Sequence, residues 1–359
     1  MLKKTLISMI VLVTVGAALF HGGKSWLKSL LPDKAHFQVL KQSQTQDLPY
    51  VMENIPESRG KILAVLTSTD KMGDDKDTGY EHTELARAYY VFVANGFEVE
   101  FASPLGGEPP RVLDGEDMGA YDYAFLNDAS IQKRLSQSIP LADIDPEHYE
   151  AVYYVGGKGT MFDFPDNPDI QRITKQMYQD GKVVSAVCHG PAALVNVKLD
   201  NGDWLLTDKS VSGFTNEEEL IIIPDAKEIF PFLLEDKLVE QGANFKPGKT
   251  YLEKVSQDGK LITGQNPWSV WKMAEMVVKE LGYTPKVRSK TPEEYSIALL
   301  QTYEEQGLQA AQQALMKNPE SYQQILLLMH GMLALMQFEL GKSIDIFSLA
   351  HTLKAELQA

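Results

Sequence analysis

The sequence has little cysteine: Cys188 is the only one in 359 residues. No disulfide can form within the chain, so its stability must come from packing alone. A lone cysteine is usually a small buried hydrophobe, and its neighbours decide whether it is reactive. Positive charge is also scarce: 34 Lys and Arg against 49 Asp and Glu give a net charge of -15. This balance argues against a nucleic-acid partner, which requires clustered Lys and Arg.

The first 24 residues form a segment of their own. Lys3 and Lys4 precede an apolar run from Thr5 to Phe20, the pattern of a signal peptide or a membrane anchor. No cysteine follows the run as in a lipoprotein, and no clear A-x-A cleavage site is present. We therefore expect an uncleaved membrane helix over residues 1–24. A cleaved signal peptide and a buried helix of a soluble protein are the alternatives.

The lysines at the start favour an N-terminus that stays in the cytoplasm, although Lys24 and Lys28 weaken this bias. The remainder of the chain is then expected on the exported, periplasmic side of the cytoplasmic membrane, anchored at its N-terminus. Secretion after cleavage is the alternative. Residues 25–58 are polar and mixed, which predicts a linker between the membrane and a folded domain.

Short apolar runs alternate with helical segments from residue 59 to residue 285. The expected strands are Lys61–Thr67, Phe97–Ser103, Ala151–Gly157 and Lys182–Val187. Compact apolar runs of this kind are typical of buried parallel strands. The alternation predicts an α/β fold with a parallel sheet sandwiched by helices, in which ligands bind at the carboxyl ends of the strands. Cys188 directly follows one of those ends.

Residues 286–359 show no strand pattern. Thr291 followed by Pro292 and two glutamates is a good helix start, and breaks fall near Gly307, Asn318 and Gly341. The segment predicts an all-helical C-terminal extension. Its run Ile325–Phe338 is too short to span a bilayer comfortably and is expected to be a buried helix. A membrane-contacting or dimerising surface is the alternative.

The segment Val183–Leu194, VVSAVCHGPAAL, carries the chemistry. A strand delivers Cys188, His189 and Gly190 make a turn, and Pro191 begins a helix. This order is similar to a nucleophile elbow, which holds a side chain above the sheet in a tight turn. The positive end of the helix is expected to lower the pKa of the Cys188 thiol and favour the reactive thiolate. A buried structural cysteine beside a surface histidine is the alternative.

Several motifs together resemble the ThiJ/PfpI superfamily. AVCHGPAAL, the upstream YVGGKGTMFDFPDNP and the downstream SVSGFTNEEE occur in the expected order over about residues 59 to 283. The closest resemblance is to the branch of glutathione-independent glyoxalases and related heat-shock chaperones. It implies a flavodoxin-like fold of the class I glutamine amidotransferase-like type. Family members often form homodimers, and residues 286–359 are a candidate surface for a homodimer or another protein partner.

The resemblance also assigns roles to individual residues. Cys188 matches the family nucleophile, His189 the second catalytic residue, and Glu84 in TGYEHTE the carboxyl group beside the nucleophile. Glu219 matches the acid that orients the histidine, although its neighbours Glu217 and Glu218 could be mistaken for it. These residues fit the general scheme of nucleophile, base and orienting acid.

Gly156 and Gly157 match the family's oxyanion-binding glycines, where backbone N–H groups face a substrate oxygen. Lys158 stands where the branch commonly has histidine, which changes the polarity of the substrate pocket. No cofactor is expected. Aromatic residues (Tyr89, Tyr90 and Phe92) occupy the region of a metal-binding histidine found in some chaperone members, so no metal is expected either.

The resemblance implies a cysteine-dependent lyase of the glyoxalase III (D-lactate dehydratase) type. Such an enzyme converts methylglyoxal to D-lactate or glyoxal to glycolate through a hemithioacetal on Cys188. Deglycation of proteins is related chemistry. The alternative is a chaperone-like or redox-sensing stress protein whose cysteine is oxidised. Peptidase or amidotransferase activity would rest on fold kinship alone and ranks last.

Overall fold

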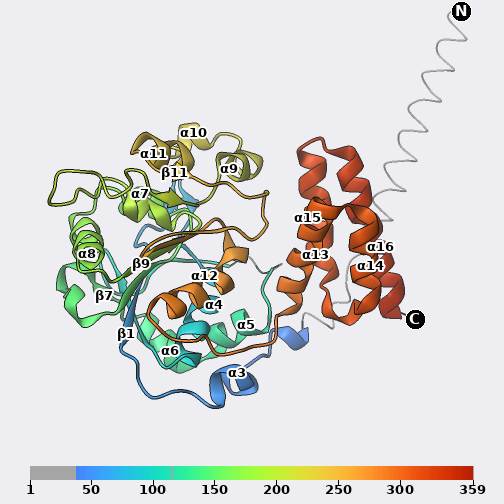
Figure 1. Ribbon diagram of the computed structural model, residues 1–359, viewed down its shortest axis with the longest axis horizontal. Helices are drawn as coiled ribbons and strands as arrows, with labels where there is room; N and C mark the ends of the chain where they lie inside the picture. The colour runs from blue at the N-terminus through green and yellow to red at the C-terminus, as the bar shows by residue number, and fades with distance from the viewer. Residues whose placement is uncertain (1–37, 114, 116, 359) are drawn as a thin grey trace, which may run out of the picture. The chain divides into compact units, whose positions relative to one another are not determined.

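The computed structural model describes residues 38–113, 115 and 117–358 (Figure 1). The expected membrane helix, residues 1–24, lies outside the described residues, as does the linker up to residue 37. Within the described part of the chain, no helix is long and apolar enough to cross a membrane. The remainder of the expected linker includes helix α3 (Pro49–Met52), where Tyr50 and Val51 are buried.

The centre of the first unit, Gln38–Ala298, is a seven-stranded sheet in the order β12-β13-β9-β8-β1-β5-β7. All neighbouring strands are parallel except β12 and β13, which form an antiparallel pair. The expected parallel sheet is therefore present, with one reversed edge strand. The strands are β1 (Lys61–Val65), β5 (Glu98–Ser103), β7 (Ile139–Pro140), β8 (Ala151–Tyr154), β9 (Val183–Val187), β12 (Val255–Asp258) and β13 (Leu261–Gly264).

Helices cover both faces of the sheet. Successive residues of a strand point to opposite faces, and the Tyr153 hydroxyl donates to the backbone oxygen of Glu84 in α4 (His82–Ala94). The next side chain, Tyr154, hydrogen-bonds Thr174 in α8 (Pro168–Gln179). Helix α12 (Val270–Glu280) packs against α4, so these two helices share a face and α8 lies on the other (Figure 1).

Smaller elements complete this unit. Its remaining α-helices are α5 (Ala120–Asn127), α6 (Ala129–Leu135), α7 (Thr160–Asp163), α9 (Asn216–Ile222), α10 (Ala226–Ile229) and α11 (Leu234–Glu240). Three two-stranded ladders pair β2 (Lys71–Met72) with β3 (Lys76–Asp77), β4 (Tyr80–Glu81) with β6 (Arg111–Val112), and β10 (Ser210–Val211) with β11 (Asn244–Phe245). The 3-10 turns are η1 (Thr45–Asp47), η2 (Leu141–Asp143), η3 (Pro146–His148), η4 (Gly190–Leu194) and η5 (Pro267–Ser269).

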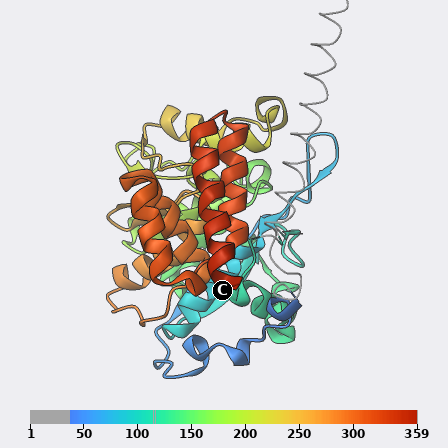
Figure 2. The same cartoon turned by 90° about the vertical axis from the view of Figure 1, so that its right-hand side faces the viewer.

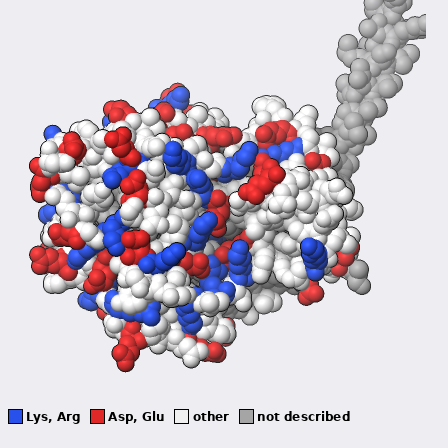
Figure 3. Space-filling view, in the orientation of Figure 1, with Lys and Arg blue, Asp and Glu red and all other residues white. Residues whose placement is uncertain are grey.

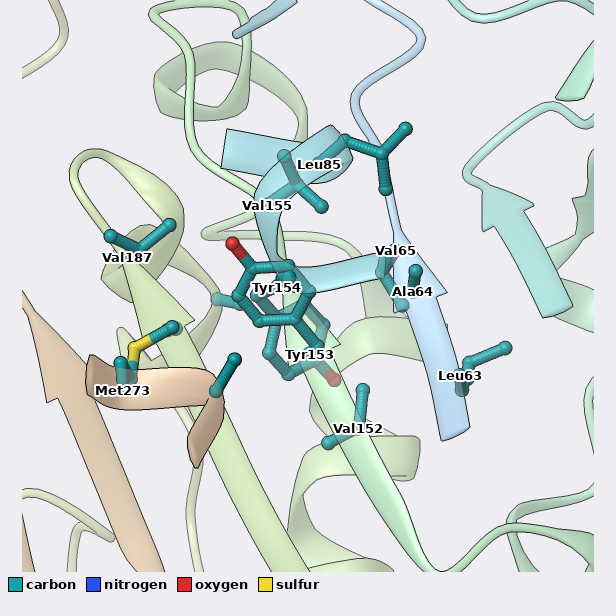
Figure 4. Close-up of a cluster of buried hydrophobic side chains, with 14 of the residues drawn as sticks. Leu63, Ala64, Val65, Leu85, Val152, Tyr153, Tyr154, Val155, Val187 and Met273 are labelled. Carbon is teal, nitrogen blue, oxygen red and sulfur yellow. The ribbon is translucent and has the colours of Figure 1, made fainter. Parts of the chain in front are cut away.

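The core of this unit lies on both sides of the central strands. Figure 4 shows Leu63 and Val65 of β1 beside Val152 and Tyr153 of β8, with Met273 of α12 nearby. These side chains are completely buried. The close packing fixes the ends of β1, β8 and β9, and the candidate site is built on those ends.

The second unit, from Leu299 onward, is helical, as the sequence predicts for this region. Its helices are the end of α13 (Pro292–Gln306), α14 (Leu308–Lys317), η6 (Pro319–Ser321), α15 (Gln324–Met336) and α16 (Leu340–Gln358). Figure 2 shows α15 and α16 side by side. Leu326 and Leu327 are buried, as expected for this apolar run, but Phe338 is 89% exposed. The two compact units divide within α13, after Ala298.

Charge is mixed over the visible surface. Figure 3 shows Lys and Arg interspersed with Asp and Glu, so the net charge of -15 does not form a single-sign field on this face. Such a surface serves solubility.

Candidate active site

Cys188 lies directly after β9 and has a φ of 58°, in the left-handed region that non-glycine residues rarely occupy. Its backbone is held on both sides: its N–H donates to Gly264 at 3.0 Å, and its oxygen accepts from Phe214 at 2.8 Å. A strained backbone at a strand end is the geometry of a nucleophile elbow. The turn predicted from the sequence is therefore present.

The element after the turn differs from the prediction. It is η4 (Gly190–Leu194), a 3-10 helix of five residues, where the sequence predicted a longer helix. Gly190 is required at its start, because a Cβ there would collide with the backbone oxygen of Tyr154. So short a helix supplies little positive potential to the sulfur.

His189 connects the sulfur to an acid. Its Nδ1 lies 3.2 Å from Sγ of Cys188, and its Nε2 lies 2.5 Å from Oε2 of Glu219 in α9. The ring is buried and lies against Phe214, with the two centroids 4.5 Å apart. A carboxylate can only accept, so Nε2 carries a proton and Nδ1 faces the thiol. Cys188, His189 and Glu219 thus form the arrangement that the sequence predicted.

The structure separates Glu219 from its two neighbours. Glu217 is exposed. Glu218 is buried and accepts hydrogen bonds from Tyr251, Gln265, Asn266 and Thr215 at 2.7 to 3.2 Å. Its carboxyl therefore holds loops together and caps α9. Burial would raise the pKa of Glu219, but His189 and then Lys158 lower it below its usual value.

Glu84 lies close to Cys188, in the first turn of α4. It is completely buried. A Cβ added to Gly156 would collide with Oε2 of Glu84 and would lie 2.8 Å from Cβ of Cys188, so the three residues meet at one point. Burial raises the pKa of Glu84 well above its ordinary value, and the charge of Glu81 raises it further. Both effects favour the protonated, neutral form of Glu84.

Burial also raises the pKa of the Cys188 thiol well above its ordinary value, and the negative charge of Glu84 adds to this. The lowered pKa expected from the sequence is therefore wrong for this site, because the helix is short and the sulfur is desolvated. The positive charge of Lys158 lowers the pKa of the Cys188 thiol, but by less than burial raises it. Cys188 and Glu84 are a coupled pair, and the effect of Glu84 on the thiol vanishes when Glu84 carries the proton.

The glycine turn after β8 is packed against the segment that precedes α4. Gly156 accepts a hydrogen bond from the N–H of Glu81 at 3.0 Å, and Gly157 accepts from the Thr160 hydroxyl at 2.8 Å. Gly157 has a φ of 108°, and a Cβ there would collide with the backbone of residues 79–81. Only glycine fits this close approach. The turn lies next to Glu84 and Cys188, where the sequence placed it.

Two residues of this site were not found from the sequence. Glu81 is the N-cap of α4, three residues before Glu84, and the acid-x-x-acid spacing was its only signal. Phe214, the aromatic partner of the His189 ring, carries no signal in the sequence. Among the described residues, no group of three or more His, Cys, Asp or Glu side chains is placed to hold a metal ion.

Comparisons with known proteins agree with this geometry. A family model described as the DJ-1/PfpI family matches residues 77–216. The chain is 33% identical to "Glyoxalase 3" of Candida albicans over 236 residues, which cover 61% of this chain and 97% of that protein. The crystal structure of glyoxalase III from Candida albicans has a TM-score of 0.58 at 31% identity, covering 63% of this chain and 98% of that one. Rapid Encystment Protein 24 kDa of Francisella tularensis has a TM-score of 0.60 at 36% identity, covering 62% of this chain and 100% of that one.

Proposed function

The chain belongs to the DJ-1/PfpI family, and we propose that it is a glyoxalase that converts methylglyoxal to D-lactate, or glyoxal to glycolate, without glutathione. The observation that carries the proposal is the contact of Cys188 with His189, whose other ring nitrogen meets Glu219. The buried Glu84, whose pKa is raised, lies beside them. Two relatives named as glyoxalases, at 33% and 31% identity, support it.

The reaction begins with the proton of the Cys188–Glu84 pair on Glu84. The thiolate adds to the aldehyde carbon, C1, and a carbon–sulfur bond forms. Glu84 gives its proton to the aldehyde oxygen, which yields a hemithioacetal and leaves Glu84 as a carboxylate. The protein thus supplies the thiol that glutathione would supply.

The next step moves hydrogen within the substrate. The Glu84 carboxylate takes the proton from C1 and returns it to C2 through an enediol, while His189 moves the hydroxyl proton from the C1 oxygen to the C2 oxygen. C1 is oxidised to a thioester and C2 is reduced to an alcohol, so no external oxidant is needed. The backbone amides of Gly156 and Gly157 are the groups that would stabilise the negative oxygen.

Hydrolysis completes the cycle. Water adds to the thioester carbon, and His189, held by Glu219, accepts its proton. The carbon–sulfur bond breaks and the acid leaves. The proton on His189 returns to the Cys188–Glu84 pair, so the sum is one methylglyoxal plus one water to one lactic acid.

The test is a lactate assay without glutathione on the full chain in mild detergent. Wild type is expected to form D-lactate from methylglyoxal, and Cys188→Ala none. The exposed Glu217→Gln variant is the matched control and is expected to retain the wild-type rate. No lactate from wild type, or equal rates from wild type and Cys188→Ala, would contradict the proposal.

A redox-sensing role is the rival and is less well supported. Easy oxidation needs an exposed thiolate, but Cys188 is only 5% exposed.

We also propose that residues 1–24 anchor the protein on the periplasmic side of the cytoplasmic membrane. Lys3 and Lys4 before the apolar run Thr5–Phe20 support this. Resistance to carbonate extraction from membranes is the expected result, and release into the soluble fraction would contradict it.

We propose, finally, that residues 286–359 take part in self-association. Phe338 and Ile344, which are 89% and 68% exposed, support this. Light scattering should give a dimer for wild type and a monomer for Phe338→Ser, and a monomeric wild type would contradict the proposal.

A further inference from the structure

A second carboxyl group lies beside Glu84 and has no role in the reaction described so far. Glu81 is the N-cap of α4, and its Oε2 accepts the Thr83 hydroxyl at 2.5 Å and the Glu84 N–H at 2.9 Å. Its Oε1 is buried and has no hydrogen-bond partner within the described residues. An unsatisfied buried oxygen is costly and calls for an explanation.

The two carboxyl groups have different surroundings. Burial raises the pKa of Glu81 above its ordinary value, and its bonds to Thr83 and Glu84 and the charge of Arg87 offset part of this rise. Its place at the N-terminus of a helix of 13 residues also favours a negative charge. For Glu84, burial and the charge of Glu81 both raise the pKa. Neighbouring carboxyl groups whose surroundings differ in this way divide the proton unequally.

We propose that Glu81 is a positioning residue that stays ionised and keeps the proton of the Cys188–Glu84 pair on Glu84. The inference rests on the proposed function, since the first step needs an acid at Glu84 beside a thiolate. The hydrogen bonds of the Glu81 carboxyl go to Thr83 and Glu84, not to the sulfur of Cys188. It acts through the electrostatic potential at Glu84 and through the cap that fixes the start of α4.

Other charged groups also act on this pair. Glu81 raises the pKa of Glu84 and Arg87 lowers it, while at the Cys188 thiol Glu218 raises the pKa and Lys158 lowers it. Arg87 is bound to Asp122 at 3.1 and 3.3 Å, so its positive charge is largely matched. Burial raises the pKa of Tyr153 well above its ordinary value, so this phenol stays neutral beside Glu84. Burial likewise raises the pKa of Tyr80, next to Glu81.

The single cysteine of the chain allows a direct test. The rate of alkylation of the full chain by iodoacetamide reports on Cys188 alone and is measured against pH. Glu81→Gln keeps an oxygen that accepts the bonds from Thr83 and Glu84 but removes the charge. Without the charge of Glu81 the shared proton is expected to pass from Glu84 to Cys188, which leaves less thiolate. The alkylation curve and the acidic limb of the pH–rate profile of lactate formation are therefore both expected to move to higher pH, by at least about half a pH unit.

Three further variants make the result specific. Glu81→Asp restores the charge and is expected to recover at least half of the shift. Thr83→Val removes a donor to Glu81 at nearly constant volume. It is expected to shift the curve in the same direction as Glu81→Gln, by a smaller amount. It also serves as the test if Glu81→Gln does not fold. Glu57→Gln removes an exposed charge and should leave the curve in place.

An unmoved alkylation curve in Glu81→Gln overturns the inference. If Glu81→Gln does not fold, an unmoved curve in Thr83→Val overturns it instead. An equal shift in the control Glu57→Gln also overturns it. Alkylation needs no dicarbonyl substrate. The absence of lactate from wild type would therefore refute the glyoxalase proposal alone, and the alkylation curves would still decide the role of Glu81.

Discussion

The hydrogen bond between His189 and Glu219 gives the sharpest prediction about catalysis. The 2.5 Å contact joins two buried groups, and Glu219 fixes which ring nitrogen carries the proton. Glu219→Gln keeps the shape but replaces the carboxylate by a neutral amide. The amide can accept from Nε2 or donate to it, so Nδ1 no longer faces the sulfur in one fixed protonation state.

The expected magnitude follows from the kind of bond that is lost. A hydrogen bond to a charged group contributes about 1.5–3 kcal/mol. If the transition state loses this amount, kcat/KM falls about 10- to 150-fold, since about 1.4 kcal/mol corresponds to a factor of ten. KM should change little, because Glu219 contacts the histidine and, in the proposed mechanism, does not bind the substrate.

The assay is lactate formation from methylglyoxal at several substrate concentrations. The exposed Glu217, two residues earlier in the same helix, provides the control: Glu217→Gln makes the same change of charge on α9. Thermal unfolding of both variants checks that the fold is intact. The reasoning is refuted if Glu219→Gln retains kcat/KM within about twofold of wild type while Cys188→Ala is inactive.

Three further predictions concern stability. Asp122→Asn leaves the buried Arg87 without its ion-pair partner and should lower the free energy of unfolding by about 3–5 kcal/mol in urea titration; a loss below about 1 kcal/mol would contradict the assignment. Gly190→Ala places a Cβ against the Tyr154 carbonyl and should lower Tm by several degrees, whereas Gly181→Ala, with open space around it, should lower Tm by less. Burial lowers the pKa of His330 to about 3, below the unfolded value of about 6.5, so its stability contribution is complete above pH 6.5 and is lost as pH falls towards 3. His330→Leu should therefore remove about 2 kcal/mol of the stability lost between pH 7 and pH 5, and an unchanged pH dependence would refute this.

Much of the fold and site is encoded locally and could be predicted from the sequence. The apolar runs before Gly156 and Cys188 mark parallel strands, and the order Cys188-His189-Gly190-Pro191 marks the turn after the second of them. These signals depend on neighbouring residues only. The family resemblance added Glu84 and Glu219. The structure places Glu84 near Cys188 and Glu219 against His189.

The remaining features depend on contacts between distant segments. The reversed strand β12 follows from a hairpin around Asp258-Gly259, a turn signal that the strand alternation obscured. The raised pKa of Cys188 depends on how much protein covers the sulfur, which no local pattern states. The different roles of Glu218 and Glu219 became visible only when the partners of each carboxyl were known.

The left-handed backbone of Cys188 has a consequence for how this site can change over evolutionary time. A side chain with a Cβ costs about 1 kcal/mol at such a position, and glycine would remove that cost. Mutation under selection for stability alone would therefore drift towards glycine at residue 188. A cysteine retained in this backbone conformation is a signature of selection for activity, and its loss in a descendant protein would mark the point at which the chemistry was abandoned.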